Sequence, residues 1–289
     1  MIGYKSIVYA KVVWRRHYGV LVPVQMPHAI PDKLSSHKVR LGLVRTGSML
    51  GRWEELFDQV GETDWWHIIK DDLEDLSNLS SNTRSKVRRG LKNYQVAPES
   101  RQVVVNEGYE VYRAAFRRYR TFDQLLSALD FQDAVESLPA QTEFWVARSL
   151  KTGQMVAFSE NLVRDGAVFY DTIWFNPTAL KSYVGYALFH EMNKHYLNGR
   201  GFRYVSDGAR SISHQTNVHQ FLQEKFGFRR AYARLRVAYA PGIGMAVVML
   251  YPFRRWIEKS KLSLLQKISI VLEQERIRRA CANVKILAE

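Results

Sequence analysis

The sequence predicts an α+β protein with a mixed sheet flanked by helices, and two observations support this prediction. From about residue 95 to 240, the segments run strand, helices, three antiparallel strands, helix, strand, helix, strand. This order is not a regular βαβ repeat. The composition, 46% hydrophobic and 12% aromatic over 289 residues, is that of a globular chain.

Residues 1–80 form an expected β-rich region. Four runs in this region alternate and are rich in Val, Ile and aromatic residues: "SIVYAKVVW" (6–14), "GVLVPVQMP" (19–27), "KVRLGLV" (38–44) and "WWHIIKD" (65–71). Such runs are typical of strands.

Residues 81–240 form an expected second domain. Asn82-Thr83 is a helix-capping pair before "RSKVRRGLKN" (84–93), and "RQVVVN" (101–106) favours a strand. The segment 108–120 has one apolar helical face, and 121–138 indicates one or two further helices.

The second half of this domain contains three consecutive antiparallel strands. The turns "KTGQ" and "RDG" join the segments 142–150, 155–164 and 167–175. The remaining expected elements are helix 183–198, strand 202–207, helix 215–226 and strand 229–240.

Residues 241–289 form an expected basic amphipathic helical tail. The apolar stretch 242–253 is shorter than the roughly 20 residues that span a bilayer. The tail packs as a helix on the domain or lies in a membrane interface, and we favour packing. Its candidate docking face is the set Met245, Val248, Met249 and Trp256.

The net charge of +14 favours an anionic partner: a nucleotide cofactor, nucleic acid or an acidic membrane surface. Four cations on the predicted helix 84–93 could hold a phosphate group, or could simply form a solvated face: Arg84, Lys86, Arg88 and Arg89. The single cysteine and the absence of an HExxH pair predict that there is no metal site. No signal peptide is evident, so a cytoplasmic protein is expected, with the inner face of a membrane as an alternative location.

Gly185 lies in the first turn of an expected helix, where free backbone N–H groups favour phosphate binding. The alternative is that Gly185 only allows close packing. Together with the hairpin before it and the ending Phe226-Gly227-Phe228 after it, the stretch Ser182–Ala187 resembles the pyrophosphate loop of the GNAT acyltransferase superfamily. The resemblance covers about residues 95–240. Ser182 replaces the usual Gln or Arg, and Gln223 stands where many members have a tyrosine.

The resemblance implies acyl-CoA as donor, held by Ile173, Trp174, Lys181, Ser182, Tyr183, Val184, Gly185, Tyr186, Ala187, Thr216 and Asn217. The acyl group would lie where two strands separate, with Asp207 as the first candidate base. Asp207 could instead cap the next turn. Asp171 is the second candidate and Glu160 the third.

The segments "TDWWHIIKD", "SSNTRSKVRRGLKNYQV" and "FGFRRAYARLRVAYAPGI" also resemble the Fem-type, FemAB-like branch. This branch implies an aminoacyl-tRNA donor as an alternative to acyl-CoA. The acceptor would be an amine on an anionic cell-envelope sugar or peptidoglycan-type precursor, and Arg210 joins the four cations as a substrate-binding candidate. A non-catalytic module that binds nucleic acid or membrane is the third alternative.

Overall fold

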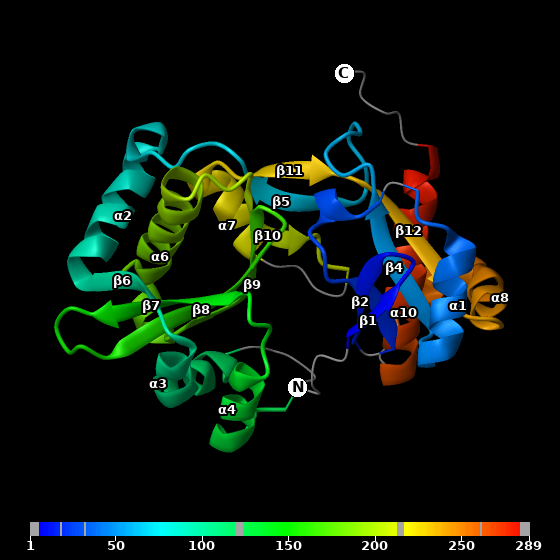
Figure 1. Cartoon of the computed structure of the whole chain (residues 1–289), viewed down its shortest axis with the longest axis horizontal. Coiled ribbons are helices and arrows are strands. Elements are labelled where there is room, and N and C mark those ends of the chain that lie inside the picture. Colours follow the sequence, from blue (N-terminus) through cyan, green and yellow to red (C-terminus); the bar gives the residue numbers. More distant parts are fainter. Residues whose placement is uncertain are drawn as a thin grey trace. The chain divides into compact units, whose positions relative to one another are not determined.

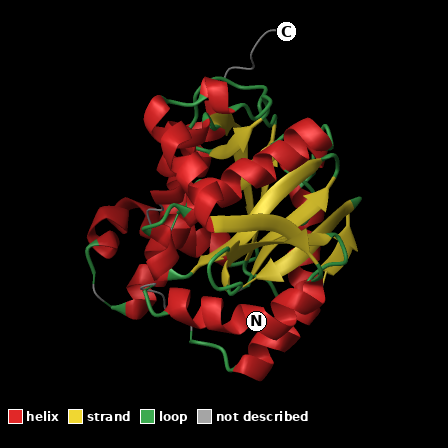
Figure 2. Ribbon diagram, turned by 90° about the vertical axis from the view of Figure 1, so that its left-hand side faces the viewer, coloured by secondary structure: helices red, strands yellow, loops and turns green. Residues whose placement is uncertain are grey.

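The structure is a computed structural model that describes residues 6–17, 19–31, 33–118, 124–212, 217–260 and 262–283. The chain divides into two compact units, each assembled from separate stretches of the sequence (Figure 1). Figure 2 shows the strands with helices packed around them. The first unit contains residues 69–208 and 218–229, and the second contains residues 5–68, 209–217 and 230–289. The domains expected from the sequence, 1–80, 81–240 and 241–289, remain a prediction.

A seven-stranded mixed sheet has the order β11-β5-β10-β9-β8-β7-β6. Its strands are β5 (Trp66–Lys70), β6 (Tyr94–Glu99), β7 (Thr142–Ser149), β8 (Met155–Arg164), β9 (Ala167–Phe175), β10 (Val205–Ala209) and β11 (Arg229–Tyr232). The strands β6 to β9 pair antiparallel, whereas β10 is parallel to β9. The predicted α+β class with a GNAT-like mixed sheet is confirmed.

Helices cover both faces of this sheet. The elements are α2 (Ser81–Asn93), α3 (Arg101–Phe116), α4 (Ala128–Glu136), α5 (Pro177–Leu180), α6 (Val184–Asn193) with a π-helical continuation (Lys194–Gly199), and α7 (Asn217–Phe226), together with the 3-10 turn Leu76–Asn78. Figure 1 shows α3 and α4 on one side of β7 and β8, and α2 and α6 on the other. Phe158 of β8 packs against α3 and α4, and Asn161 of β8 donates to Met192 of α6.

The strand expected at 101–106 is wrong, because these residues form the first part of α3. The three consecutive valines favour a strand only locally. In the fold, Val104, Val105 and Val111 lie on one buried helical face, and this tertiary packing outweighs the local preference.

The second unit contains a five-stranded sheet of order β1-β2-β3-β4-β12. Its elements are β1 (Ser6–Tyr9), β2 (Val12–His17), β3 (Val20–Pro23), β4 (Leu50–Glu55), β12 (Arg234–Tyr239), α1 (Ser36–Thr46) and the 3-10 turn Pro27–Ala29. The strand expected at 38–44 is wrong, because this run lies in α1, whose C-terminal end is capped by Gly47 with φ +61°. Val39 and Leu43 are buried at the i, i+4 helical spacing.

The tail forms α8 (Ile243–Leu250), a 3-10 turn (Tyr251–Phe253), α9 (Arg254–Glu258), α10 (Ser263–Ala280) and a 3-10 turn (Cys281–Asn283). Val247, Ile257 and Leu272 form its buried cluster. The docking face expected from the sequence is wrong: Met245, Val248, Met249 and Trp256 are 60–73% exposed, because the opposite side of these helices fills the core. Among the described helices, none has the length and hydropathy needed to cross a membrane.

Candidate active site

The parallel strands β9 and β10 separate soon after they begin to pair. Their register covers Val205 with Val168 and Ser206 with Phe169, and β9 then continues to Phe175. At the point of separation Gly208 has φ +84°, and a Cβ there would lie 2.8 Å from the Phe169 ring. Glycine is therefore required by both conformation and space. The result is a gap between the strands in the sheet, at the position where the sequence predicts the acyl group.

A β-bulge in β9 lies next to this gap. Glu160 of β8 pairs with Thr172, whereas the next residue, Asn161, pairs with Tyr170. Asp171 is thus the extra residue of the bulge. A bulge interrupts the hydrogen-bond pairing between two strands and changes the direction of the side chains beside it. It therefore allows a charged residue to occur in an otherwise apolar strand.

Glu160 is a strongly perturbed carboxyl group next to the bulge. Its side chain is buried, at 6% exposure, on the same face of β8 as Phe158. Burial and the charge of Asp171 raise the pKa of Glu160 to about 8, against a partial opposing effect of Arg101. Glu160 therefore holds its proton at neutral pH and can release it just above neutral pH, which suits proton transfer in a reaction.

Asp207 forms a different arrangement on the other face of the sheet. His219 Nε2, from α7, lies 3.2 Å from Asp207 Oδ2 and 3.2 Å from the Asp207 carbonyl oxygen. Burial raises the pKa of Asp207, although the hydrogen bond with His219 partly lowers it. The sequence did not assign His219 to this role. The structure brings Asp207 together with α7, whereas Glu160 and Asp171 lie together at the bulge.

The first turn of α6 is covered by α2. Gly90 of α2 lies against Tyr183 and Ala187, so that a Cβ at Gly90 would be 2.6 Å from the Tyr183 carbonyl oxygen. Figure 1 shows these two helices side by side. Val184, Gly185 and Ala187 are buried, while Lys181 is exposed. Packing does not require glycine at 185, because an added Cβ would meet only the Phe175 ring, at 3.7 Å.

Other predicted donor-site residues lie in different places. Ile173 and Trp174 are half-buried on β9, and Trp174 stacks edge-on to Tyr112 of α3. Asn217 is the exposed first residue of α7, and Thr216 lies outside the described residues. Arg210 belongs to the second unit, where its side chain donates to the Asp64 carbonyl oxygen at 2.8 Å.

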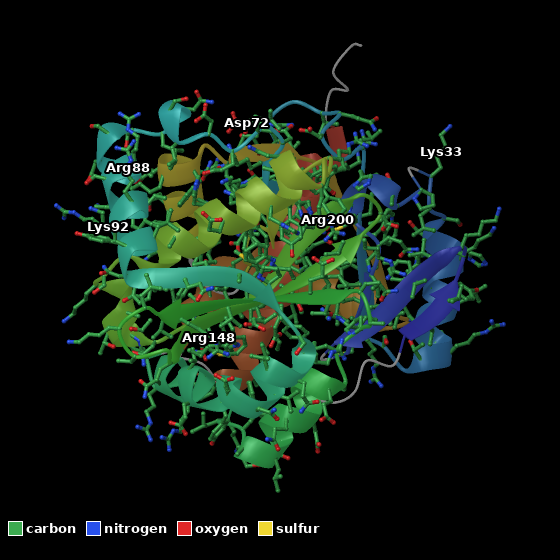
Figure 3. The ribbon with its side chains drawn as sticks, turned by 60° about the vertical axis from the view of Figure 1, so that its left-hand side comes forward. Lys33, Asp72, Arg88, Lys92, Arg148 and Arg200 are labelled. Carbon is green, nitrogen blue, oxygen red and sulfur yellow. The ribbon has the colours of Figure 1, made fainter. Side chains whose placement is uncertain are left out.

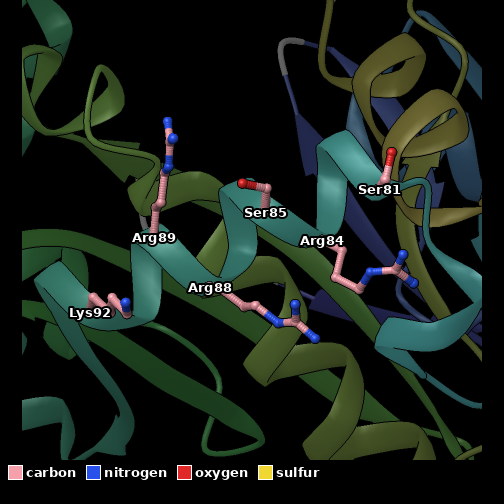
Figure 4. A pocket seen from close by; sticks show the side chains of 6 residues that line it. All are labelled: Ser81, Arg84, Ser85, Arg88, Arg89 and Lys92. Atoms are coloured by element: carbon pink, nitrogen blue, oxygen red, sulfur yellow. The ribbon is translucent and has the colours of Figure 1, made fainter.

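The outer side of α2 carries an open pocket of about 410 Å³, which we call the α2 pocket. It is lined by Ser81, Arg84, Ser85, Arg88, Arg89 and Lys92. Figure 4 shows Arg84 and Arg88 on one side of the helix and Arg89 on the other, and Figure 3 shows that Arg88 and Lys92 are at the surface. No carboxylate lines the pocket. The structure therefore places three of the four predicted cations together, and the fourth, Lys86, instead lies over the Tyr186 ring at 5.4 Å.

Three residues that the sequence did not predict also belong to this pocket: Ser81, Ser85 and Lys92. Their spacing was a usable signal, because Ser81 and Ser85, like Arg84, Arg88 and Lys92, are four residues apart on one helix. The four-residue spacing places side chains of each series one above another. The hydroxyl groups add hydrogen-bond donors to the cations, and both suit an anion.

Together, the separated strands, the bulge and the helix order define a GNAT-like fold. No protein-family model matches the sequence, and no curated protein sequence matches it. Among solved structures, the chain is similar to L-PGS from Bacillus licheniformis, with 14% identity, 94% of this chain and 90% of that chain covered, and a TM-score of 0.52. FemX is similar over 89% of this chain and 91% of its own, with 8% identity and a TM-score of 0.54. The C-terminal domain of a putative lysylphosphatidylglycerol synthetase from Agrobacterium fabrum has 12% identity, coverage of 86% and 87%, and a TM-score of 0.50. At these identities the similarity is one of fold.

Proposed function

We propose that this protein is an acyltransferase that moves an acyl group from an anionic donor to an amine on a cell-envelope molecule. The observation that carries this proposal is the bulge at Asp171, which brings the raised-pKa carboxyl group of Glu160 close to Asp171 on β9, the strand that borders the gap to β10. Acyl transfer to an amine requires a proton acceptor and a place for the acyl group in line with the amine. The gap would hold the acyl group, and Glu160 would accept the proton of the amine once it is itself deprotonated, just above neutral pH.

Aminoacyl-tRNA is the donor that the surface fits better. The α2 pocket offers four cations and two hydroxyl groups without a carboxylate, and the whole chain has a net charge of +14. A polyanion gains affinity from many such contacts. In addition, α2 covers the first turn of α6, where a GNAT-like protein would bind the pyrophosphate of acyl-CoA. One protein of similar fold, a putative lysylphosphatidylglycerol synthetase, is by its name one that forms an aminoacylated phospholipid.

Acyl-CoA is the second candidate donor, and Gly185 favours it. Packing leaves room for a side chain at this position, so the glycine has no steric explanation in the fold. A backbone that a phosphate approaches closely would explain it. The acceptor that fits both donors is an anionic sugar or peptidoglycan-type precursor with a free amine.

The test compares both donors directly. Full-length protein is incubated with a radiolabelled aminoacyl-tRNA pool or with acetyl-CoA, and retention and transfer to cell-envelope precursors are measured. Arg88→Glu with Arg89→Glu should weaken tRNA retention at least tenfold, and added salt should weaken it steeply in the wild type. Lys151→Glu, an exposed charge reversal in the β7–β8 turn of the same unit, is the matched control.

The outcomes separate the alternatives. Loss of tRNA binding in the α2 variant but not in Lys151→Glu supports the aminoacyl donor. If tRNA binding is unchanged, while acetyl-CoA is retained and Gly185→Ala abolishes that retention, the donor is acyl-CoA. If wild-type protein transfers no acyl group from either donor, the acyltransferase proposal is wrong.

A further inference from the structure

The tail presents seven large apolar side chains to solvent, which we call the tail face. Its members are 60–73% exposed: Met245, Val248, Met249, Phe253, Trp256, Leu262 and Leu264. Met245, Val248 and Met249 lie on one side of α8, at the i, i+3 and i+4 positions, and Phe253 and Trp256 are three residues apart. Isolated exposed apolar residues are ordinary, but a gathered set on consecutive helices marks an interaction site.

The tail face is exposed although the helices that carry it are anchored. On their inner side, Val247, Ile257 and Leu272 are at most 5% exposed and form one cluster. Around this cluster pack the half-buried Tyr239, Ile243, Leu250, Tyr251, Leu265, Ile268 and Val271. The inner side therefore already supplies the packing of the tail against β12, and the tail face is left for another partner.

Further contacts fix the tail in place. Glu275 of α10 accepts hydrogen bonds from Arg278, Arg279 and Tyr239, the last of these from β12. The Arg279 guanidinium lies 3.9 Å from the centre of the Tyr251 ring. These contacts connect the 3-10 turn, α10 and β12, so the helices that carry the tail face are packed in fixed positions on this unit.

The charge around the tail face is strongly positive. Residues 242–270 contain five Lys or Arg residues and one carboxylate, Glu258. Arg255 and Lys259 are exposed next to Trp256, and Arg254 lies over the Tyr251 ring at 4.5 Å. A surface with tryptophan, phenylalanine and methionine at its centre and cations at its edge complements the boundary between anionic headgroups and acyl chains.

We propose that the tail face is a membrane-interface site that binds an anionic phospholipid bilayer without crossing it. The apolar side chains enter the headgroup boundary, and Arg255 and Lys259 contact the phosphate groups. A soluble protein partner would need a complementary apolar surface with an acidic edge, whereas an anionic bilayer offers both properties on any part of its surface. This proposal concerns the tail alone, so it holds for either donor and does not depend on the transfer reaction.

The experiment measures co-sedimentation of the full chain with vesicles of phosphatidylglycerol and phosphatidylcholine, and with vesicles of phosphatidylcholine alone. The apolar variant is Met249→Glu with Trp256→Glu. Its matched control is Leu129→Glu on α4, because Leu129 and Trp256 are each 73% exposed. The charge variant is Arg255→Glu with Lys259→Glu. Thermal unfolding of each variant checks that the fold is retained.

The expected result is binding to the anionic vesicles that falls as salt rises, and weaker binding to phosphatidylcholine alone. The charge variant should lose at least tenfold in vesicle affinity, because it replaces two cations near an anionic surface by carboxylates. The apolar variant should also lose at least tenfold, because it places two charges where apolar side chains enter the headgroup boundary. Leu129→Glu should bind like the wild type.

Three results would overturn the proposal. One is a wild-type protein that stays in the supernatant with anionic vesicles at low salt. Another is equal loss of binding in Leu129→Glu. The third is a stable dimer, seen by analytical ultracentrifugation, that Met249→Glu with Trp256→Glu dissociates, because a second copy of the chain would then cover the tail face.

Discussion

The carboxyl group of Glu160 on β8 lies close enough to Asp171 on β9 for the Asp171 charge to raise its pKa, since the bulge at Asp171 brings two acidic residues together in a buried part of the sheet. Burial is the larger cause of the shift and the neighbouring charge the smaller one. Two carboxyl groups in such a place do not both ionise at neutral pH without a cost in stability. Carboxyl groups with strongly shifted pKa values, kept at a cost in stability, are typical of functional sites.

The first prediction concerns stability and pH. The pKa of Glu160 is raised from an ordinary value near 4.5 to about 8, so the folded state binds a proton more tightly than the unfolded state does. The stability that the folded state gains from protonated Glu160 is fully present below pH 4.5 and is lost as pH rises through about 8. Glu160→Gln should remove the loss, so that the variant is more stable than the wild type at pH 9 by up to about 4 kcal/mol. Urea unfolding at pH 5, 7 and 9 measures this difference, with the exposed Glu136→Gln as control. A wild-type free energy of unfolding with the same pH dependence as that of Glu160→Gln would contradict the shift.

The second prediction separates two candidate bases. If Asp207 accepts the proton of the amine, Asp207→Asn should lower turnover about 100-fold and leave donor affinity unchanged. If Glu160 is the base, turnover of the wild type should instead rise with pH through about 8, and Glu160→Gln should abolish this rise. Steady-state rates from pH 6 to 9 for both variants decide between them. Near-normal rates in Asp207→Asn remove that residue as the base.

The third prediction concerns the contact between α2 and α6. Gly90→Ala should destabilise the first unit by about 1–3 kcal/mol, because the new Cβ would lie 2.6 Å from the Tyr183 carbonyl oxygen and 3.0 Å from the Ala187 Cβ. This loss should exceed the gain of about 1 kcal/mol that alanine normally gives within a helix. Chemical denaturation measures it. Gly61→Ala, where an added Cβ meets nothing within 4 Å, should be nearly neutral. A Gly90→Ala protein as stable as the wild type would show that the two helices do not pack closely.

The fourth prediction concerns the anchor of the tail. Burial alone would raise the pKa of Glu275, but hydrogen bonds from Arg278, Arg279 and Tyr239 lower it to about 2. This contribution to stability is present above the ordinary glutamate pKa and is lost as pH falls through about 2. Glu275→Gln should therefore lower the free energy of unfolding by about 1–3 kcal/mol at pH 7. The difference from the wild type should shrink between pH 4 and pH 2. A constant difference over that range would indicate that packing, not charge, explains the effect of the substitution.

The sequence by itself determined the main order of elements from residue 142 to residue 226. The single strand expected at 229–240 is wrong, because the structure divides it into β11 and β12, which belong to different sheets. Strong alternation and the turns "KTGQ" and "RDG" fixed the β7–β8–β9 meander, and Gly185 marked the beginning of α6. These signals are local, because turn residues and period-two patterns depend on neighbours in the chain. The segments 38–44 and 101–106 were mispredicted, since Val39 and Leu43 in the first and Val104 and Val105 in the second are buried on helical faces that only the assembled core defines.

Tertiary structure alone decided which candidate residues meet. The bulge at Asp171 depends on the register between β8 and β9, and the pairing of Asp207 with His219 joins residues twelve positions apart on a strand and a helix. The contact of Gly90 with Tyr183 spans more than ninety positions. The tail face also depends on the fold. The sequence predicted that one apolar side of the tail is buried, but it predicted the wrong side. Two sides of α8 are apolar, and only the packing of Val247 into the core decides which of them is buried. Periodicity identifies the apolar faces of a helix, and the partner that covers each of them is set by distant parts of the chain.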